Sequence, residues 1–308
     1  MEEEKFIFDV GEEDKGKRLD KYLVENLSED LSRSFIQKLI TDGNVLSDNQ
    51  PVKSHHRVGI GEFIEVTIPA AKPLSVKGEK IPLNIVYEDK DIMLVNKPAG
   101  MVVHPAPGNY TGTLVNALMG LRKKLSGISG ITKPGIVHRT DKGTSGLLIV
   151  AKNDNAHRAL AKQFKAKGIK KIYIAVVEGV LELDNGVIDL PIGRHSRDRK
   201  KMAVNFVSSK EASTRYKVLE RFKNSTLLEI AITTGRTHQI RVHMSYIGHP
   251  LLGDEKYGVK ARIGRPALHA KLIGFTHPVT KEYMEFTAPL PKDMKVLINE
   301  LKSHKTGK

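Results

Sequence analysis

The segment Val137–Leu147, with the sequence VHRTDKGTSGL, places an imidazole, a guanidinium, a carboxylate and several hydroxyls in one glycine-containing turn. His138, Asp141 and Ser145 supply the three residue types of a serine-hydrolase triad. That class presents its nucleophile in a G-x-S-x-G turn, whereas the pattern here is G-T-S-G. Three triad members so close along the chain would also struggle to reach the required geometry. The spacing argues against a hydrolase and leaves the carboxylate as the candidate.

Asp141 stands between Arg139 and Lys142 at the end of an apolar run. One interpretation is a solvated turn aspartate, since this residue type favours turns. The other involves a second arginine-rich turn, TGRTHQIR at 234–241. A guanidinium from that turn could pair with the carboxylate and keep it ionised in an apolar pocket. Such an aspartate could attack or stabilise an electron-poor sugar carbon without a cofactor.

Metal and nucleotide chemistry have little support in the sequence. His238 and His243 lie five residues apart, and neither an H-E-x-x-H motif nor any cysteine accompanies them. The phosphate-binding patterns G-x-x-x-x-G-K-[ST] and G-x-G-x-x-G are both missing. We therefore expect no metal and no nucleotide cofactor, and a methyltransferase is disfavoured for the same reason.

The charge points to a polyanionic partner. The chain of 308 residues has a formal net charge of +15, divided into −5 for residues 1–75 and +20 for the remainder. A basic excess of this size is typical of nucleic-acid binding, although some proteins are simply basic. No apolar run is long enough for a transmembrane helix, and the acidic N-terminus lacks a signal region, so we expect a cytoplasmic protein with no membrane partner.

The first part of the chain predicts a small module at residues 16–68, after an acidic segment at 1–15. Apolar residues recur at helical spacing in two stretches, and three strand-like pieces follow, the last alternating with period two. The helical faces consist of Leu19, Tyr22, Leu23 and Leu27, and of Phe35, Ile36, Leu39 and Ile40. A proline- and lysine-containing stretch at 69–83 is predicted to be a linker.

The larger part, residues 84–300, predicts an α+β domain followed by a basic tail at 301–308. Buried strands are expected at 91–97 and 146–152, and a longer strand from Lys170. An antiparallel pair is expected at 213–222 and 225–235. Helices are predicted at 154–168, with Asp154 as the cap and Gly168 as the stop, and from about 237. Because strands come in adjacent runs, we expect a mixed, mostly antiparallel sheet flanked by helices and loops.

Several spaced segments then resemble one family. VHRTDKGTSGLLIVAK is similar to the H-R-L-D-x-x-T-S-G signature of RNA pseudouridine synthases of the RluA family, and TGRTHQIRVH resembles its second signature. NKPAGMVVHP, KKIYIAVVEG, GHPLLGDEKYG and LHAKLIGFTHP are similar to further family segments. Residues 16–68 resemble the alpha-L RNA-binding domain of large-subunit rRNA members, and the domain order is closest to the RluD-like branch.

The resemblance implies a role for each matching residue. Asp141 would be the catalytic carboxylate, and Arg139 would fill the space left when the target uridine leaves the stack. Tyr173 would stack on the extruded base, although a core aromatic in a strand is the alternative. Arg241 would pair with Asp141, with Arg236 as the weaker candidate. The family uses neither cofactor nor metal.

One residue departs from the family pattern. Leucine precedes the aspartate in the signature, whereas Thr140 stands there in this chain. Loss of a buried aliphatic side chain should weaken core contacts by about 1–2 kcal/mol without removing the chemistry.

The implied function is isomerisation of specific uridines in RNA, with 23S rRNA or the pre-ribosomal large subunit as partner. We expect a monomer, because no long exposed apolar stripe stands out in the sequence. One rival is a non-catalytic RNA-binding or ribosome-assembly factor with a decayed site. A weaker rival is a cofactor-dependent RNA-modifying enzyme. The residues predicted to contact RNA are Arg33, Lys38 and Lys53 in the small module, and His138, Lys162, Lys165, Lys170, Arg194, Arg197, Arg199, Lys200, Arg236 and His238 in the larger domain.

Overall fold

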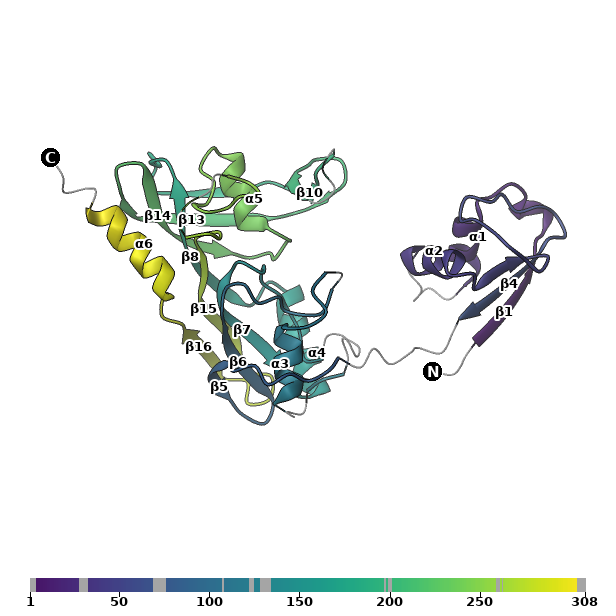
Figure 1. The fold of residues 1–308 in the computed structure, drawn as a ribbon, viewed down its shortest axis with the longest axis horizontal. Coiled ribbons are helices and arrows are strands. Elements are labelled where there is room, and N and C mark those ends of the chain that lie inside the picture. The colour runs from purple at the N-terminus through teal and green to yellow at the C-terminus, as the bar shows by residue number, and fades with distance from the viewer. Residues whose placement is uncertain are drawn as a thin grey trace. The chain divides into compact units, whose positions relative to one another are not determined.

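The chain divides into two compact units, Met1–Leu74 and Ser75–Lys308, which are described separately (Figure 1). The computed structural model describes residues 4–27, 33–68, 76–106, 108–121, 125–127, 134–196, 198, 201–258, 261 and 263–303. Within these ranges no helix is long and apolar enough to cross a membrane.

The small unit packs two helices against a four-stranded antiparallel sheet. Helices α1 (Leu19–Asn26) and α2 (Arg33–Thr41) bury most of their predicted apolar faces against strand residues such as Val45, Ile64 and Val66. The sheet order is β1 (Glu4–Asp9), β4 (Phe63–Ile68), β2 (Val45–Ser47) and β3 (Gln50–Pro51). A short 3-10 helix, η1 (Glu12–Asp14), follows β1.

Two predictions for this unit are wrong. The acidic segment 1–15 was predicted to precede the module, but β1 pairs with β4 along its whole length, from Glu4 opposite Ile68 to Asp9 opposite Phe63. The alternation of apolar and acidic side chains in EKFIFD suits an edge strand with one covered face. Phe35 was expected on the buried face of its helix, yet it is 37% exposed because Ile36, Leu39 and Ile40 form the contact face instead.

A buried carboxylate joins the two helices of the small unit. Asp20 is fully buried in α1 and accepts hydrogen bonds from Arg18, from Arg33 and from Gln37, the last two on α2. Burial alone would raise the pKa of Asp20, but these hydrogen bonds outweigh it and hold the pKa far below its usual range. Arg33, predicted to contact RNA, therefore also stabilises the helix pair.

The large unit is built on a mixed sheet of nine strands. The order is β5 (Asn84–Glu88), β6 (Ile92–Lys97), β7 (Ser145–Ala151), β15 (Leu268–Thr276), β8 (Lys170–Glu178), β14 (Ser225–Ile232), β13 (Ser213–Arg221) and β9 (Asn185–Asp189), with β16 (Tyr283–Thr287) paired to β15. Neighbours are antiparallel except β7 and β15, the single parallel pair among the described strands. This confirms the predicted α+β class with a mostly antiparallel sheet.

Helices cover both faces of the sheet at the β6–β7 end. Helices α3 and α4 lie near these strands in Figure 1. Side chains alternate between the faces of a strand. On β6 and β7, one alternate set packs with Ala156 and Leu160 of α4 (Asp154–Lys165). The other set packs with Leu114, Val115 and Leu118 of α3 (Leu114–Gly120). Both strands are therefore continuously apolar, as the sequence predicted.

The side chains of β8 also alternate between two faces covered by helices, and the candidate site lies on one of these faces. Tyr173, Ala175 and Val177 face α5 (Gln239–Tyr246), which contributes Ile240 and Met244 to the same cluster. On the other face Val176 packs with Leu297 and Ile298 of α6 (Lys292–Ser303), the helix that runs beside the sheet in Figure 1. Tyr173 consequently lies on the side of the sheet that carries α5.

Gly146 explains the glycine in the first signature. It adopts a φ of +111°, and a Cβ there would lie 2.2 Å from the carbonyl oxygen of Ala270. Since β7 and β15 pair at this point, only glycine permits the close approach of their backbones.

Several predicted boundaries of the large unit need correction. Residues 76–83 do not act as a linker, because Val76, Ile81 and Leu83 pack against the α3 cluster. Residues 301–303, predicted to begin the basic tail, belong to α6, which continues to Ser303. Helix α4 is capped by Asn153, whose side chain accepts from Ala156 N, and its left-handed end residue is Lys167 rather than Gly168. Three short strands, β10 (Ile192–Arg194), β11 (Met202–Val204) and β12 (Ser209–Lys210), form a separate sheet.

Candidate active site

One pocket brings the two sequence turns together. Its volume is about 60 Å³, and strands β8, β14 and β15 provide its apolar wall. The lining consists of Arg139, Thr140, Asp141 and Thr144 from the first turn, Gly235, Arg236, His238, Gln239, Ile240 and Arg241 from the second, and Tyr173, Ile232 and Leu268 from the sheet.

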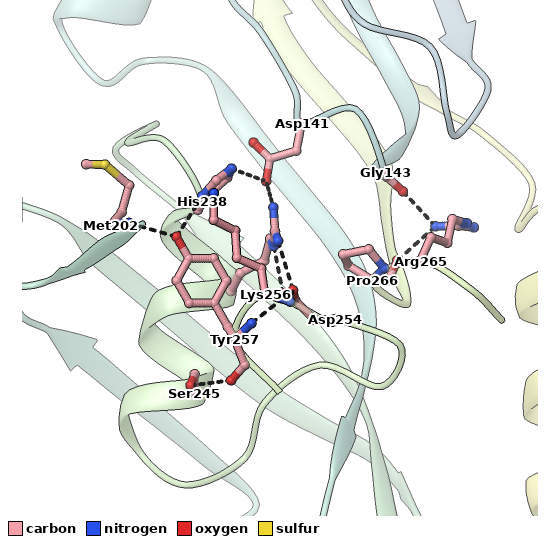
Figure 2. Close-up of polar contacts among 11 residues, drawn as sticks. Asp141, Gly143, Met202, His238, Ser245, Asp254, Lys256, Tyr257, Arg265 and Pro266 are labelled. Carbon is pink, nitrogen blue, oxygen red and sulfur yellow. Dashed lines mark hydrogen bonds and ion pairs between the residues drawn. The ribbon is translucent and has the colours of Figure 1, made fainter. Parts of the chain in front are cut away.

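A single guanidinium links two carboxylates at this pocket (Figure 2). Arg241 Nη1 donates to Asp141 Oδ2 at 3.1 Å. The same side chain donates from Nε and Nη2 to the two oxygens of Asp254, at 2.7 and 2.8 Å. Asp254 is fully buried, whereas the side chain of Asp141 is 18% exposed. The arginine is therefore fixed by a buried carboxylate and presents a free edge to the accessible one.

The charges of this cluster support one another. Burial works against the charge of Arg241, but the hydrogen bonds to Asp254 and the charge of Asp141 more than compensate, so its pKa lies above the usual value. Asp254 also accepts hydrogen bonds from the backbone amides of Lys256 and Tyr257. Arg241 stacks over the Tyr257 ring, 5.0 Å from its centroid, which adds a cation–π contact.

Gln239 fixes the second turn ahead of α5. Its side-chain oxygen accepts from Thr234 Oγ1 and from Arg236 N, and its amide nitrogen donates to Ser213 O. The residue before the helix, His238, takes a left-handed φ of 58°. These contacts explain why the TGRTHQ segment forms a defined loop that delivers Arg241 to the pocket.

His238 is a neutral neighbour of the carboxylate. Its Nε2 lies 4.0 Å from Asp141 Oδ2, and its Nδ1 contacts Tyr257 Oη at 2.7 Å. Burial lowers the pKa of His238 to about 4, although the charge of Asp141 opposes this. The ring therefore carries no charge near neutral pH, and its proximity to Asp141 is a polar contact rather than an ion pair.

Tyr173 and Arg139 occupy different parts of the pocket. Tyr173 is 9% exposed on the apolar wall, and burial, with the charge of Asp141, raises the pKa of its phenol so that it remains protonated. Arg139 is exposed at the edge. Both positions are compatible with the stacking and space-filling roles that the resemblance implied.

The loop that carries Asp141 is fixed on both sides. Thr144 N donates to Asp141 O at 3.1 Å and closes the turn, and Gly100 N donates to Lys142 O at 2.8 Å. Arg265 Nη1 donates to Gly143 O at 3.1 Å, as Figure 2 shows, while the rest of its guanidinium pairs with Asp293. The carboxylate is thus positioned before any substrate arrives.

The other chemical groups of the first signature are directed away from Asp141. Ser145 Oγ is buried and hydrogen-bonded to His269 Nδ1 at 3.0 Å. His138 Nε2 accepts from Ile149 N, its ring stacks on Phe164, and burial lowers its pKa to about 3. No hydrolase triad forms, and His138 contributes to the structure of the turn rather than offering a cation to RNA.

Lys97 is a site residue that sequence reasoning missed. Its side chain is completely buried and donates to the carbonyl oxygens of Pro98 and Met101. Burial lowers its pKa to about 7, while the negative charge of Asp141 acts in the opposite direction. Near neutral pH its positive charge is therefore present only in part behind the loop of Asp141.

The predicted RNA contacts are distributed over several surfaces. Lys38 and Lys53 are exposed on the small unit, and Lys162 and Lys165 are exposed on α4. Lys170 is exposed but paired with Glu285 at 2.8 Å, and Arg236 Nε donates to Glu211 O. Arg194 is exposed at the end of β10. Arg197, Arg199 and Lys200 lie outside the described residues.

A metal ion has one geometric candidate among the described histidines and carboxylates. Asp89, Asp91 and His277 place their ligand atoms within 4.8 Å of one another. Asp89 already accepts from His277 and from the backbone amides of Asp91 and Ile92, so its oxygens are occupied within the fold. This cluster is separate from the residues that line the pocket of Asp141.

Signals for the missed residues were present in the sequence. Lys97 stands in NKPAGMVVHP, and Asp254 and Tyr257 stand in GHPLLGDEKYG, two segments quoted for their resemblance to the family. Neither segment contains a pattern that predicts which of its residues belongs to the site. The contact between Asp254 and Arg241, for example, joins a loop after α5 to the helix itself.

Two family profiles and several known proteins match this chain. The sequence profile of the RNA pseudouridylate synthase family matches residues 91–246, and that of the S4 domain matches residues 17–64. The chain is 51% identical over 297 residues to an uncharacterized RNA pseudouridine synthase, YlyB, of Bacillus subtilis, covering 96% of this chain and 97% of that protein. It is 45% identical over 300 residues to ribosomal large subunit pseudouridine synthase D of Zymomonas mobilis, covering 93% and 94%.

A solved structure is also similar. Human RNA pseudouridylate synthase domain containing 1 superposes with a TM-score of 0.57 at 26% identity, covering 75% of this chain and 99% of that one. The chain belongs to the RluA-type RNA pseudouridine synthases, isomerases that act on RNA, and it carries an RNA-binding S4 domain at its N-terminal end.

Proposed function

We propose that this enzyme isomerises specific uridines of large-subunit ribosomal RNA, using ionised Asp141 on an extruded nucleotide and no cofactor. The observation that carries the proposal is the pairing of Asp141 with Arg241 at the pocket, with the arginine held by buried Asp254. An ionised carboxylate beside a pocket with an apolar wall suits a reaction in which a sugar carbon becomes electron-poor.

The chemistry can be written without an external reagent. The C1′–N1 bond breaks, the uracil turns, and C5 bonds to C1′. The proton on C5 is then lost, and N1 gains one. Asp141 is the only carboxylate among the lining residues, so it is the group available to add to the sugar, to stabilise its positive charge or to remove a sugar proton. Tyr173 offers an aromatic face to the turning base, and Arg139 would occupy the vacated stack.

Basic groups near the pocket support an RNA substrate. Arg236 lines both the pocket of Asp141 and a second hollow bordered by Arg194 and Lys210 of the three-stranded sheet. Extruding a uridine costs a few kcal/mol, which phosphate contacts along such a path can offset. The net charge of +20 on residues 76–308 acts in the same direction.

The choice of ribosomal RNA rests on the similarity to a protein named ribosomal large subunit pseudouridine synthase D. We extend it to 23S rRNA or the pre-ribosomal large subunit as the partner, with the S4 domain adding affinity by tethering. We expect the enzyme to act in the cytoplasm as a monomer.

Asp141→Asn tests the proposal. The amide keeps the shape but cannot supply the charge, so pseudouridine formation should fall below detection while RNA affinity is retained. Asp184→Asn, which changes a carboxylate that is 78% exposed, serves as the matched control. Carbodiimide mapping of cellular RNA with and without each variant would identify the target. An Asn variant with nearly full activity would contradict the role of Asp141, and wild-type protein that modifies no uridine would favour a binding factor.

A further inference from the structure

Thr140 has a buried hydroxyl without a partner. It is 9% exposed, and its Oγ1 lacks a hydrogen-bonding partner among the residues that the structure describes. Its neighbours in the turn do not share this feature, because Asp141 is held by Arg241 and Ser145 Oγ contacts His269. A buried hydroxyl that makes no hydrogen bond destabilises the folded state, so its presence beside the catalytic carboxylate needs a physical reason.

The position of Thr140 suggests that reason. It lines the same pocket as Asp141 and Tyr173. Thr140 directly precedes Asp141, and consecutive Cα atoms are about 3.8 Å apart. A nucleotide whose C1′ lies against Asp141 is therefore also close to Thr140. Two polar groups flank that carbon, the ribose 2′-hydroxyl and the uracil O2. The Oγ1 atom itself is closed to solvent in the structure. A threonine hydroxyl can donate or accept, and rotation about χ1 would exchange its place with the methyl group and turn it toward the pocket.

We infer that Thr140 is a positioning residue whose hydroxyl hydrogen-bonds an oxygen of the extruded uridine. The inference rests on the proposed function and deepens it. The leucine found at this place in the family signature cannot make such a bond. Thr140 would thus orient the nucleotide against Asp141. In this chain its hydrogen bond would take the place of the aliphatic contact that the family's leucine makes.

A purely structural role of Thr140 predicts the opposite result. If the threonine merely replaces a packing residue, then removing the hydroxyl relieves an unsatisfied group. Thr140→Val, which keeps the shape, would then stabilise the fold and leave the reaction unchanged.

The experiment compares Thr140→Val with Thr140→Ser, which keeps the hydroxyl, in single-turnover pseudouridine formation on the RNA that wild type modifies. The Val variant should lose about three- to tenfold in kcat/KM, the value of one neutral hydrogen bond, with a melting temperature at or above that of wild type. The Ser variant should stay within about twofold of wild type.

A substrate with 2′-deoxyuridine at the target distinguishes the two partners. If the ribose hydroxyl is the partner, the deoxy substitution costs less in Thr140→Val than in wild type; if uracil O2 is the partner, it costs the same in both. Val activity equal to wild type, or an equal loss in the Ser and Val variants, would overturn the inference. Failure of the proposed function is separate, since it would appear as an inactive wild type.

Discussion

Asp254→Asn offers the sharpest perturbation of the site because it substitutes none of the residues that line the pocket. Asp254 is fully buried and binds Arg241 through both carboxylate oxygens. An asparagine has almost the same shape but only one acceptor, and its NH₂ group would face a donor of the guanidinium or a backbone amide of Lys256 or Tyr257.

The structure sets the magnitude. Hydrogen bonds to charged groups contribute about 1.5–3 kcal/mol, and breaking a buried pair costs about 3–5 kcal/mol of stability. The effect on rate depends on Arg241 alone. If loss of its anchor removes the 3.1 Å hydrogen bond to Asp141, then kcat/KM should fall about 10- to 150-fold, because each 1.36 kcal/mol is about tenfold in rate.

The assay is single-turnover pseudouridine formation at a temperature well below the melting point of the variant. Asp184→Asn is the control, because it removes the same group from an exposed ion pair with Arg221 that contributes about 0–1 kcal/mol to stability. Arg241→Lys complements it, since an ammonium cannot bridge two carboxylates as the planar fork does. A folded Asp254→Asn protein with kcat/KM within about twofold of wild type would refute the idea that Asp254 acts by orienting Arg241.

Two further predictions concern titration and the small unit. The NMR titration of His238 should have its midpoint near pH 4. Its neutral form therefore stabilises the folded state, and this stabilisation is lost as pH falls from about 6.5 toward 4. Asp141→Asn removes a negative charge and should lower the midpoint further, and an unchanged midpoint would contradict the coupling. Asp20→Asn should weaken the hydrogen-exchange protection of α1 and α2 in the full chain by about 1–3 kcal/mol. This is less than for a fully buried ion pair, because Arg18 and Arg33 are partly exposed. The exposed Asp42→Asn should change protection little, and equal protection in the two variants would argue against the buried pair.

Elements with strong local patterns were predictable from the sequence. The strands around Ile92 and Leu147 are apolar along their length because helices cover both faces, and α4 places Ala156, Leu160 and Phe164 on one face at helical spacing. The first strand of the small unit was missed since its alternation is short and sits in an acidic context. Its assignment depends on pairing with β4, nearly sixty residues later in the chain.

The site was predictable only in part. Asp141 and the arginine-rich segment 234–241 stood out, and charge and chemistry suggested a pair between them. The resemblance to the family then selected Arg241 over Arg236. Lys97 did not, since an apolar strand gives no sign that its last residue is a buried ammonium. The role of Asp254 depends on a loop that folds back onto α5, a tertiary contact without a local signal. The orphan hydroxyl of Thr140 likewise appears only when all its neighbours are placed.

The charge balance of the site explains why one carboxylate can act. His238 and Tyr173 are held neutral by burial, and the positive charge of Arg241 is shared between Asp141 and Asp254. Two carboxylates and one guanidinium carry a net charge of −1, and Asp254 is sealed from the pocket. If Arg241 paired with Asp141 alone, its charge would be offset entirely by the carboxylate that we propose to face a positive sugar carbon. The buried aspartate draws on that charge, so Asp141 is oriented by the arginine while remaining able to stabilise charge that develops in the substrate.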